Sequence, residues 1–155
     1  MKWNQDYFDM FAALNAANVR YLIVGAYAVG FHAEPRTTKD IDLWVEASSE
    51  NAQRLYKALA EFGAPLENVT VADFCNEEMV FQIGVPPNRI DIIMGLEGVA
   101  FEEAWQTRIE APYDGQKVFM IGREELIAVK QIAGRPQDVE DVKALEAVKN
   151  IKRYK

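Results

Sequence analysis

The sequence contains little cysteine and little histidine, the residues on which many metal sites and nucleophilic enzymes depend. Among 155 residues there is one cysteine, Cys75, and one histidine, His32. A lone cysteine excludes an internal disulfide and provides no zinc-binding pattern. Nothing in the sequence forms a Ser-His-Asp or Cys-His arrangement, so nucleophilic catalysis of that type is not indicated. We expect His32 to pack or to cap a helix.

Long hydrophobic runs are also lacking, and positive charge is in deficit. The apolar runs are far too short to cross a bilayer, and the N-terminal stretch MKWNQDYFDM has no apolar signal region. We therefore expect a cytoplasmic protein without a membrane partner. The net charge is −7, which argues against broad, non-specific nucleic-acid binding because such binding depends on neutralising phosphates. The chain length predicts one domain, residues 1–155.

Two common phosphate-binding motifs are incomplete. Gly25 and Gly30 have the glycine spacing of a P-loop, but Phe31 and His32 follow where lysine and serine or threonine are needed. The dinucleotide fingerprint G-x-G-x-x-G fails at Tyr27. These departures exclude both standard motifs and leave a glycine between a strand and a helix to be explained.

The stretch 21–46 supplies that explanation. Its apolar run 21–24 predicts a short buried strand, Gly25 ends the run, and residues 26–32 predict a short helix. A helix that begins directly after a strand presents free N–H groups and its positive dipole end to an anion. Gly25 lets a phosphate approach the backbone closely. Arg36 and Lys39 make the following loop basic, so the unit predicts a phosphate cradle.

A pair of aspartates follows the cradle. Asp40 and Asp42 alternate within the predicted strand 40–45 and therefore project to the same side. Two like charges side by side repel, and one tends to take up a proton. A divalent cation removes that conflict, and Mg²⁺ binds through one or two carboxylates plus substrate phosphates. The alternative is that one aspartate caps a turn while the other faces solvent.

A third aspartate, Asp91, lies in the apolar segment RIDIIM at residues 89–94. A carboxylate among isoleucines is costly to bury without a partner. It could pair with Arg89 or another arginine, or it could be a third metal ligand if its strand lies beside strand 40–45. We favour the ligand interpretation because an isolated buried charge is destabilising.

The remaining patterns predict an α/β or α+β fold that ends in a helical pair. Lys130 and Arg135 flank the break between the last two helices, and two interpretations stay open for them. They could hold a triphosphate, or they could pair with Asp138 and Asp141. The expected helices are 4–17, 48–62, a short one within 97–107, 123–132 and 137–149; the expected further strands are 79–85, 89–94, 108–110 and 117–121.

The motif as a whole resembles a known family. Val24-Gly25-Ala26, a spacer of residues 27–39, and Asp40-Ile41-Asp42-Leu43 resemble the signature of the nucleotidyltransferase superfamily, which has the DNA polymerase β-like fold. The segments TTKDIDLWVE, PPNRIDIIMGLEGVAFEEAW and ELIAVKQIAGRPQDVEDVKALE resemble small stand-alone bacterial nucleotidyltransferases related to AbiEii-type toxins.

This resemblance implies a mixed β-sheet with helices packed on one face and a C-terminal helical pair. It implies that Asp40, Asp42 and Asp91 are metal ligands and catalytic, with two Mg²⁺ ions expected and Mn²⁺ as an alternative. Gly25 and Ala26 would hold the nucleotide phosphates. Lys130 matches a lysine in the helical segment of related toxins, and with Arg36 and Lys39 it completes the expected nucleotide site.

One residue departs from the family pattern. Ala26 stands where glycine or serine is usual, which keeps the backbone N–H but removes the serine hydroxyl. The main hypothesis is a metal-dependent enzyme that moves a nucleoside monophosphate from an NTP to an unidentified hydroxyl on RNA, a protein or a small molecule. The alternative is a catalytically silent binding or regulatory module, with a protein partner such as an antitoxin. A metal-dependent glycosyltransferase would share D-x-D but would leave Gly25 unexplained.

Overall fold

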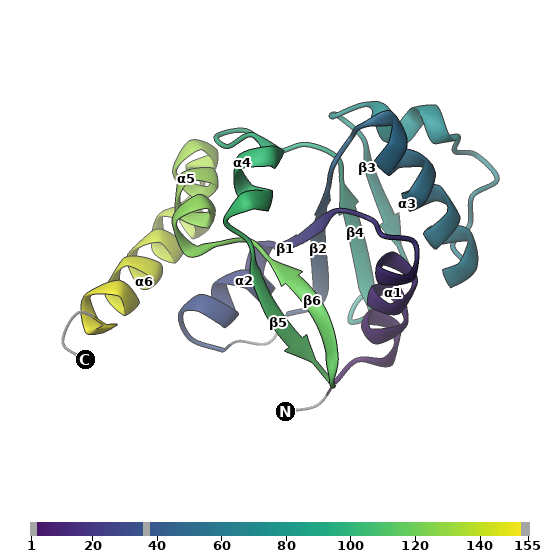
Figure 1. Ribbon diagram of the computed structural model, residues 1–155. Coiled ribbons are helices and arrows are strands. Elements are labelled where there is room, and N and C mark those ends of the chain that lie inside the picture. Colours follow the sequence, from purple (N-terminus) through teal and green to yellow (C-terminus); the bar gives the residue numbers. More distant parts are fainter. Residues whose placement is uncertain (1–2, 36–37, 153–155) are drawn as a thin grey trace.

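The computed structural model describes residues 3–35 and 38–152. A mixed six-stranded sheet forms its centre, in the order β3-β4-β2-β1-β6-β5 (Figure 1). The strands are β1 Tyr21–Val24, β2 Asp40–Val45, β3 Val80–Ile83, β4 Arg89–Ile93, β5 Ile109–Tyr113 and β6 Gln116–Met120. The helices are α1 Gln5–Ala16, α2 Gly25–His32, α3 Ser49–Phe62, η1 Val71–Cys75 (3-10), α4 Phe101–Gln106, α5 Arg123–Ala133 and α6 Pro136–Lys152. The expected α+β class is confirmed.

Strand β2 lies in the middle of the sheet and carries the site. It pairs antiparallel with β1 and parallel with β4. Ile41, Leu43 and Val45 are fully buried, whereas Asp40 and Asp42 keep partial exposure. Because alternate strand residues face opposite sides of a sheet, burying the apolar set turns both aspartates to the other side. The core pattern therefore decides where the carboxylates point.

Helices α1 and α3 pack against each other beside the sheet (Figure 1). The Asn4 side chain caps α1, and Ser48 caps α3 at Asn51 N–H. Gly63 ends α3 in the left-handed conformation. Phe11 of α1 and Leu55 of α3 are fully buried in the resulting core. The helices expected at 4–17 and 48–62 are therefore confirmed, with ends that differ by no more than one residue.

Three segments differ from the sequence-based expectation. Residues 71–75, within a stretch predicted to be loop, form a 3-10 helix because Thr70 and Asp73 cap each other's backbone N–H reciprocally. The short helix expected within 97–107 is confirmed at Phe101–Gln106, whereas the strand expected at 108–110 extends over Ile109–Tyr113. The last helix begins at Pro136 rather than Gln137, since proline is well suited to the first helical position.

The described residues include no helix with both the length and the apolar character that a bilayer crossing requires.

Candidate active site

Three carboxylates converge on one face of the sheet, near the first residues of the interior strands β2 and β4. The parallel register of β2 and β4 places Asp40 opposite Arg89 and Asp42 opposite Asp91. One carboxylate oxygen from each of Asp40, Asp42 and Asp91 lies within 4.8 Å of the other two. The condition for convergence, that strand 89–93 lies beside strand 40–45, is therefore met. Such a cluster of oxygen donors has the composition that hard divalent cations prefer.

Arg89 occupies part of the space between these carboxylates. Its guanidinium forms an ion pair with Asp40 at 2.5 Å and another with Asp91 at 3.0 Å. The Nε of Arg89 and the Oδ1 of Asp91 are both buried, and their contact lacks the alignment of a hydrogen bond. A buried carboxylate oxygen without a hydrogen bond is unfavourable. Both oxygens of Asp91 therefore face the Arg89 guanidinium, and the Oδ1 does so without a well-aligned hydrogen bond.

Asp42 has the most perturbed environment of the three. Burial is the main cause that raises the pKa of Asp42 from 3.8 to about 7. The neighbouring Asp40 and Asp91 carboxylates add to this rise, and the opposing charge of Arg89 limits it. Near neutral pH the cluster therefore holds a proton that a bound cation would displace. The like-charge repulsion expected from the spacing of Asp40 and Asp42 contributes to this shift, after burial.

The phosphate cradle lies directly against the carboxylates. Gly25 is the first residue of α2 and has a φ of +69°, and a Cβ built on it would overlap the Asp42 carboxylate. No side chain caps the N-terminus of α2. The first N–H groups of a helix have no intrahelical acceptor, so those of Gly25 and Ala26 are suited to bind a phosphate. Position 25 requires glycine for two reasons: its φ is positive, and a Cβ would overlap the Asp42 carboxylate.

The basic residues expected at the nucleotide site are placed differently from one another. Lys39 is exposed next to Asp40, and Arg36 lies outside the described residues. Lys130 is buried and forms ion pairs with Asp138 at 3.1 Å and Asp141 at 3.0 Å. Of the two interpretations left open for Lys130, the structure shows the pairing with acidic residues of α6. A phosphate contact by Lys130 stays a prediction.

Arg135, the other residue at this break, lies closer to solvent. Its side chain is 75% exposed and pairs with Asp138 at 2.7 Å. Hydrogen bonds and the charge of Asp138 raise the pKa of Arg135, and the carboxylate of Asp42 contributes to the same shift. The Arg135 guanidinium is therefore held within the electrostatic field of the carboxylate cluster, at the turn between α5 and α6.

Removing the Lys130 charge is expected to destabilise the fold. A Lys130→Met variant leaves Asp138 and Asp141 buried with less compensation, which costs about 3 kcal/mol of unfolding free energy, measurable by urea denaturation. Lys143→Met is the matched control, because the Lys143–Glu140 pair is exposed and contributes less than about 0.5 kcal/mol. Unchanged stability of Lys130→Met, together with weakened ATP binding, would instead favour the phosphate role.

Two features of the site escape prediction from the sequence. The sequence suggests Arg89 only as a partner of Asp91, whereas it bridges Asp91 and Asp40. Tyr7 belongs to an apolar helical stripe, yet its hydroxyl donates towards the Pro87 and Arg89 carbonyls at 3.2 and 3.3 Å. The i, i+2 spacing of Arg89 and Asp91 is a signal for the first feature. No local pattern points to the second.

A family model of nucleotidyltransferases matches most of the chain. The family model described as "Nucleotidyltransferase of unknown function (DUF6036)" matches residues 7–153. A search among curated protein sequences found no match.

Among solved structures, the fold is similar to that of the lincosamide antibiotic adenylyltransferase LnuA in its lincomycin-bound form. The TM-score is 0.61 at 17% identity, covering 94% of this chain and 97% of that chain. It is also similar to ANT(2'')-Ia in complex with adenylyl-2''-tobramycin, with a TM-score of 0.53 at 17% identity over 97% and 99% of the two chains. A nucleotidyltransferase-like protein from Paracoccidioides brasiliensis gives 0.55 at 19% identity over 92% and 74%.

Proposed function

This chain belongs to the nucleotidyltransferase family of unknown function DUF6036, and from that premise we propose that it is a metal-dependent transferase of nucleoside monophosphates. The donor is an NTP and the acceptor is a hydroxyl group. The convergence of Asp40, Asp42 and Asp91 beside the uncapped N-terminus of α2 carries this proposal. We expect the reaction to take place in the cytoplasm, where NTPs are abundant.

The carboxylate cluster fits a divalent cation such as Mg²⁺ or Mn²⁺. Burial, and after it the charges of Asp40 and Asp91, raise the pKa of Asp42, and a bound cation would offset both effects. Asp40, Asp42 and Asp91 would hold one ion or a pair of ions. Divalent cations so bound neutralise phosphate charge and lower the pKa of an attacking hydroxyl.

The residues of the chain provide the remaining steps. The N–H groups of Gly25 and Ala26 bind phosphate oxygens of the NTP at the positive end of α2. The acceptor oxygen forms a bond to the α-phosphorus of the NTP. The bond between that phosphorus and the oxygen that links the α- and β-phosphates breaks, and pyrophosphate leaves. Asp91 would receive the proton of the acceptor hydroxyl, and the ion pairs of Arg89 with Asp40 and Asp91 would hold the two carboxylates in position.

The catalytically silent alternative rests on Ala26. A phosphate contact through the backbone N–H survives this substitution, so the residue weakens the enzyme hypothesis little. The solved neighbours named above include adenylyltransferases that act on antibiotics, which supports a small-molecule hydroxyl as the acceptor. The relation to AbiEii-type toxins and an antitoxin partner remain predictions.

Calorimetric titration of ATP with and without Mg²⁺ tests the proposal. We expect the wild type to bind ATP only with Mg²⁺, and the Asp40→Asn/Asp42→Asn variant to lose at least about 100-fold in affinity because the metal ligands supply several kcal/mol. The matched control is Glu61→Gln/Glu67→Gln, which makes the same charge change at exposed positions. Absence of ATP binding by a folded wild type, tested with all four NTPs, would support the silent module.

A further inference from the structure

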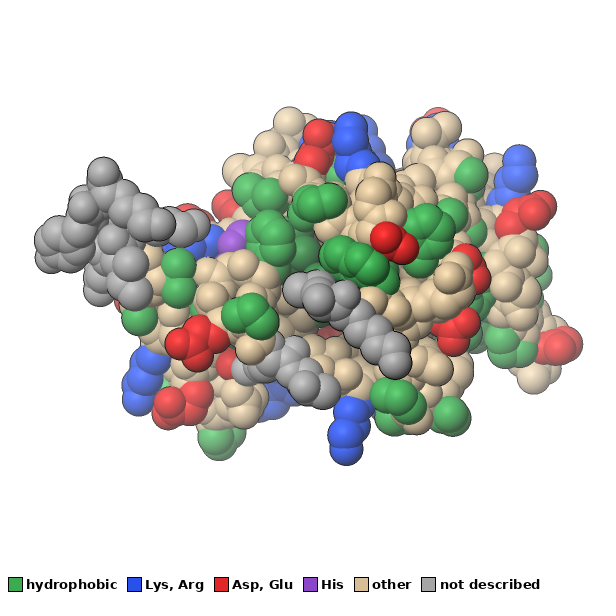
Figure 2. Space-filling model, turned by 90° about the horizontal axis from the view of Figure 1, so that it is seen from below, with side chains coloured by type: hydrophobic (Ala, Val, Ile, Leu, Met, Phe, Trp, Pro, Cys, Tyr) green, Lys and Arg blue, Asp and Glu red, His purple; other side chains and the backbone are tan. Residues whose placement is uncertain are grey.

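A large cavity opens beside the carboxylates, on the face seen from below in Figure 2. Its volume is about 1020 Å³, at the upper end of the range for sites that bind drug-sized molecules. The cavity lies between the start of α1, the second half of α2, the turn before β4 and the end of β5. Hydrophobic side chains gather on this face (Figure 2).

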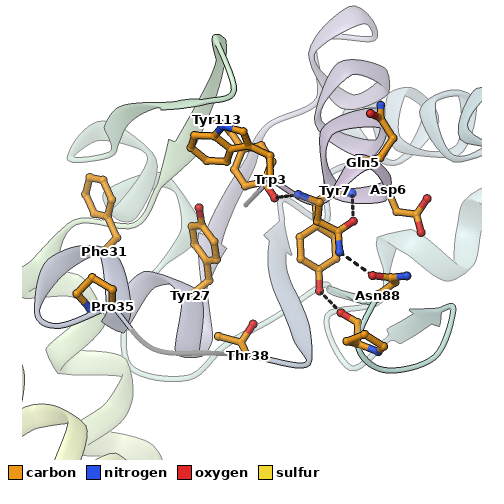
Figure 3. Close-up of a pocket in the computed structure, with 13 residues that line it drawn as sticks. Trp3, Gln5, Asp6, Tyr7, Tyr27, Phe31, Pro35, Thr38, Asn88 and Tyr113 are labelled. Atoms are coloured by element: carbon orange, nitrogen blue, oxygen red, sulfur yellow. Dashed lines mark hydrogen bonds between the residues drawn. The ribbon is translucent and has the colours of Figure 1, made fainter. Parts of the chain in front are cut away.

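Aromatic side chains form the walls of this cavity (Figure 3). The rings of Trp3 and Tyr113 lie 4.5 Å apart, and Tyr27 faces Tyr113 at 6.2 Å. Phe31 extends the wall and is 46% exposed although it is a large apolar residue. Aromatic rings arranged in this way provide flat, rigid surfaces against which another ring can pack.

The cavity lining is poor in positive charge. Among its described residues, Asp6 is the one charged side chain, and lysine and arginine are absent. The carboxylates of Asp40, Asp42 and Asp91 lie at the neighbouring strand ends. The electrostatic potential of such a cavity disfavours an anion and favours a neutral or positively charged ligand, which can also interact with aromatic faces.

Two contacts connect the cavity to the reacting centre. Thr38 lines the cavity, and its hydroxyl donates to the backbone carbonyl of Asp40 at 2.7 Å. Tyr7 lines it too, and its hydroxyl approaches the Arg89 carbonyl. Burial and, to a smaller extent, the Asp40 and Asp42 carboxylates raise the pKa of Tyr7 to about 12. The cavity lining therefore contacts the backbone at the first residues of β2 and β4, the two strands that carry the carboxylates.

We propose that this aromatic cavity binds the acceptor, and that the acceptor is a small hydroxylated compound with an aromatic or other apolar ring and at most one positive charge. This inference rests on the proposed function, since it names the substrate class of the same site. The acceptor hydroxyl forms its bond to the α-phosphorus as pyrophosphate leaves, and its proton passes to Asp91. Nucleic-acid ends are disfavoured as acceptors, because the described lining offers no lysine or arginine to neutralise their phosphates.

Ligand-observed NMR titrations with four probes test this class in the presence of Mg²⁺. Tyramine combines an aromatic ring, a hydroxyl and one positive charge. 4-Hydroxyphenylacetate has the same ring with a negative charge, ethanolamine lacks the ring, and a short RNA supplies a polyanion with a free 3′ hydroxyl. We expect tyramine to bind at least about tenfold more tightly than each of the others.

Substitution of a residue in the cavity wall tests whether tyramine binds in this cavity. Phe31→Ala is expected to weaken tyramine binding about fivefold through the lost ring contact. Val139→Ala on α6 serves as the control, because Val139 has a similar exposure of 47% and does not line the cavity. Equal or tighter binding of the anion or RNA, or no saturable binding of tyramine to the folded wild type, would overturn the proposal.

A parallel ATP titration separates this proposal from the proposed function. Loss of ATP affinity in Phe31→Ala, with tyramine binding unchanged, would assign the wall to the nucleobase and overturn the acceptor assignment. If the wild type binds tyramine but no NTP, the proposed transfer fails while the preference of the cavity for aromatic cations stands. If it binds Mg²⁺–ATP but no tyramine, the acceptor class alone is wrong.

Discussion

An Asp42→Asn variant is expected to unfold at a higher temperature than the wild type in EDTA at pH 8, although it transfers no nucleotide. The pKa of Asp42 is about 7 in the folded protein, against 3.8 for an aspartate in an unfolded chain. The folded state therefore binds a proton that the unfolded chain releases between about pH 4 and 7, and stability falls as the pH rises through that window.

The size of the effect follows from the same linkage. Above pH 7 the charged Asp42 costs up to about 4 kcal/mol of unfolding free energy, at 1.36 kcal/mol per pKa unit. Asparagine carries no charge and avoids this cost, so the variant should gain several degrees in Tm at about 2–4 °C per kcal/mol. At pH 4 the gain should shrink, because the wild-type carboxylate is then largely protonated in the folded state and about half protonated in the unfolded chain.

Calorimetric melts of the wild type and variant across pH 4–8 measure this difference. Asp40→Asn is the control, because Asp40 forms an ion pair with Arg89 and its removal should not stabilise the protein. Transfer of a nucleotide should fall by about a thousandfold or more in Asp42→Asn, since metal-bound carboxylates supply several kcal/mol to the transition state. A variant with wild-type Tm at pH 8 would contradict the assigned environment of Asp42.

Gly25→Ala is expected to lose both stability and nucleotide binding. The new Cβ would overlap the Asp42 carboxylate, and alanine is strained at a φ of +69°. The backbone strain alone costs about 1–2 kcal/mol. Displacement of Asp42 by even about 1 Å should lower activity about 100-fold. Thermal melts and the Mg²⁺-dependent ATP titration report the two losses separately.

The control for this variant is Gly63→Ala. Gly63 also has a positive φ, +95°, but nothing lies within 4 Å of a Cβ built there. Its substitution should cost a similar backbone strain while ATP binding stays intact. If Gly25→Ala and Gly63→Ala bind ATP equally well, the close contact between Gly25 and Asp42 has no role in nucleotide binding.

Much of the fold can be predicted because apolar residues recur at regular spacing in the segments that form the main helices and strands. Strand 40–45 alternates, and its buried residues leave Asp40 and Asp42 on one side. The short capped segment at 71–75 escaped prediction although Thr70 and Asp73 have capping spacing. Its signal is confined to four residues and competes with a polar, loop-like composition.

The candidate site was only partly predictable, since its remaining parts depend on contacts between distant segments. The pairing of β2 with β4 does not follow from the residues of either strand alone, and it is the register of the sheet that shows it. The sequence does not decide whether Lys130 contacts a phosphate or an acidic side chain, because both interpretations require its positive charge at the same break between two helices. The aromatic cavity draws Tyr7, Tyr27 and Tyr113 from three segments, and no local pattern brings such residues together.

The register of β2 against β4 has a consequence for how this protein can diversify. The carboxylates stand on paired strands whose other faces form the core, so a change in their alignment would also expose Ile41 or Ile90. The cavity walls instead come from parts of α1 and α2, the turn before β4 and the end of β5, and a turn tolerates substitution better than a central strand. Substitutions in the cavity walls can therefore change which acceptor binds. The carboxylates on the sheet, and with them the type of reaction, would stay the same.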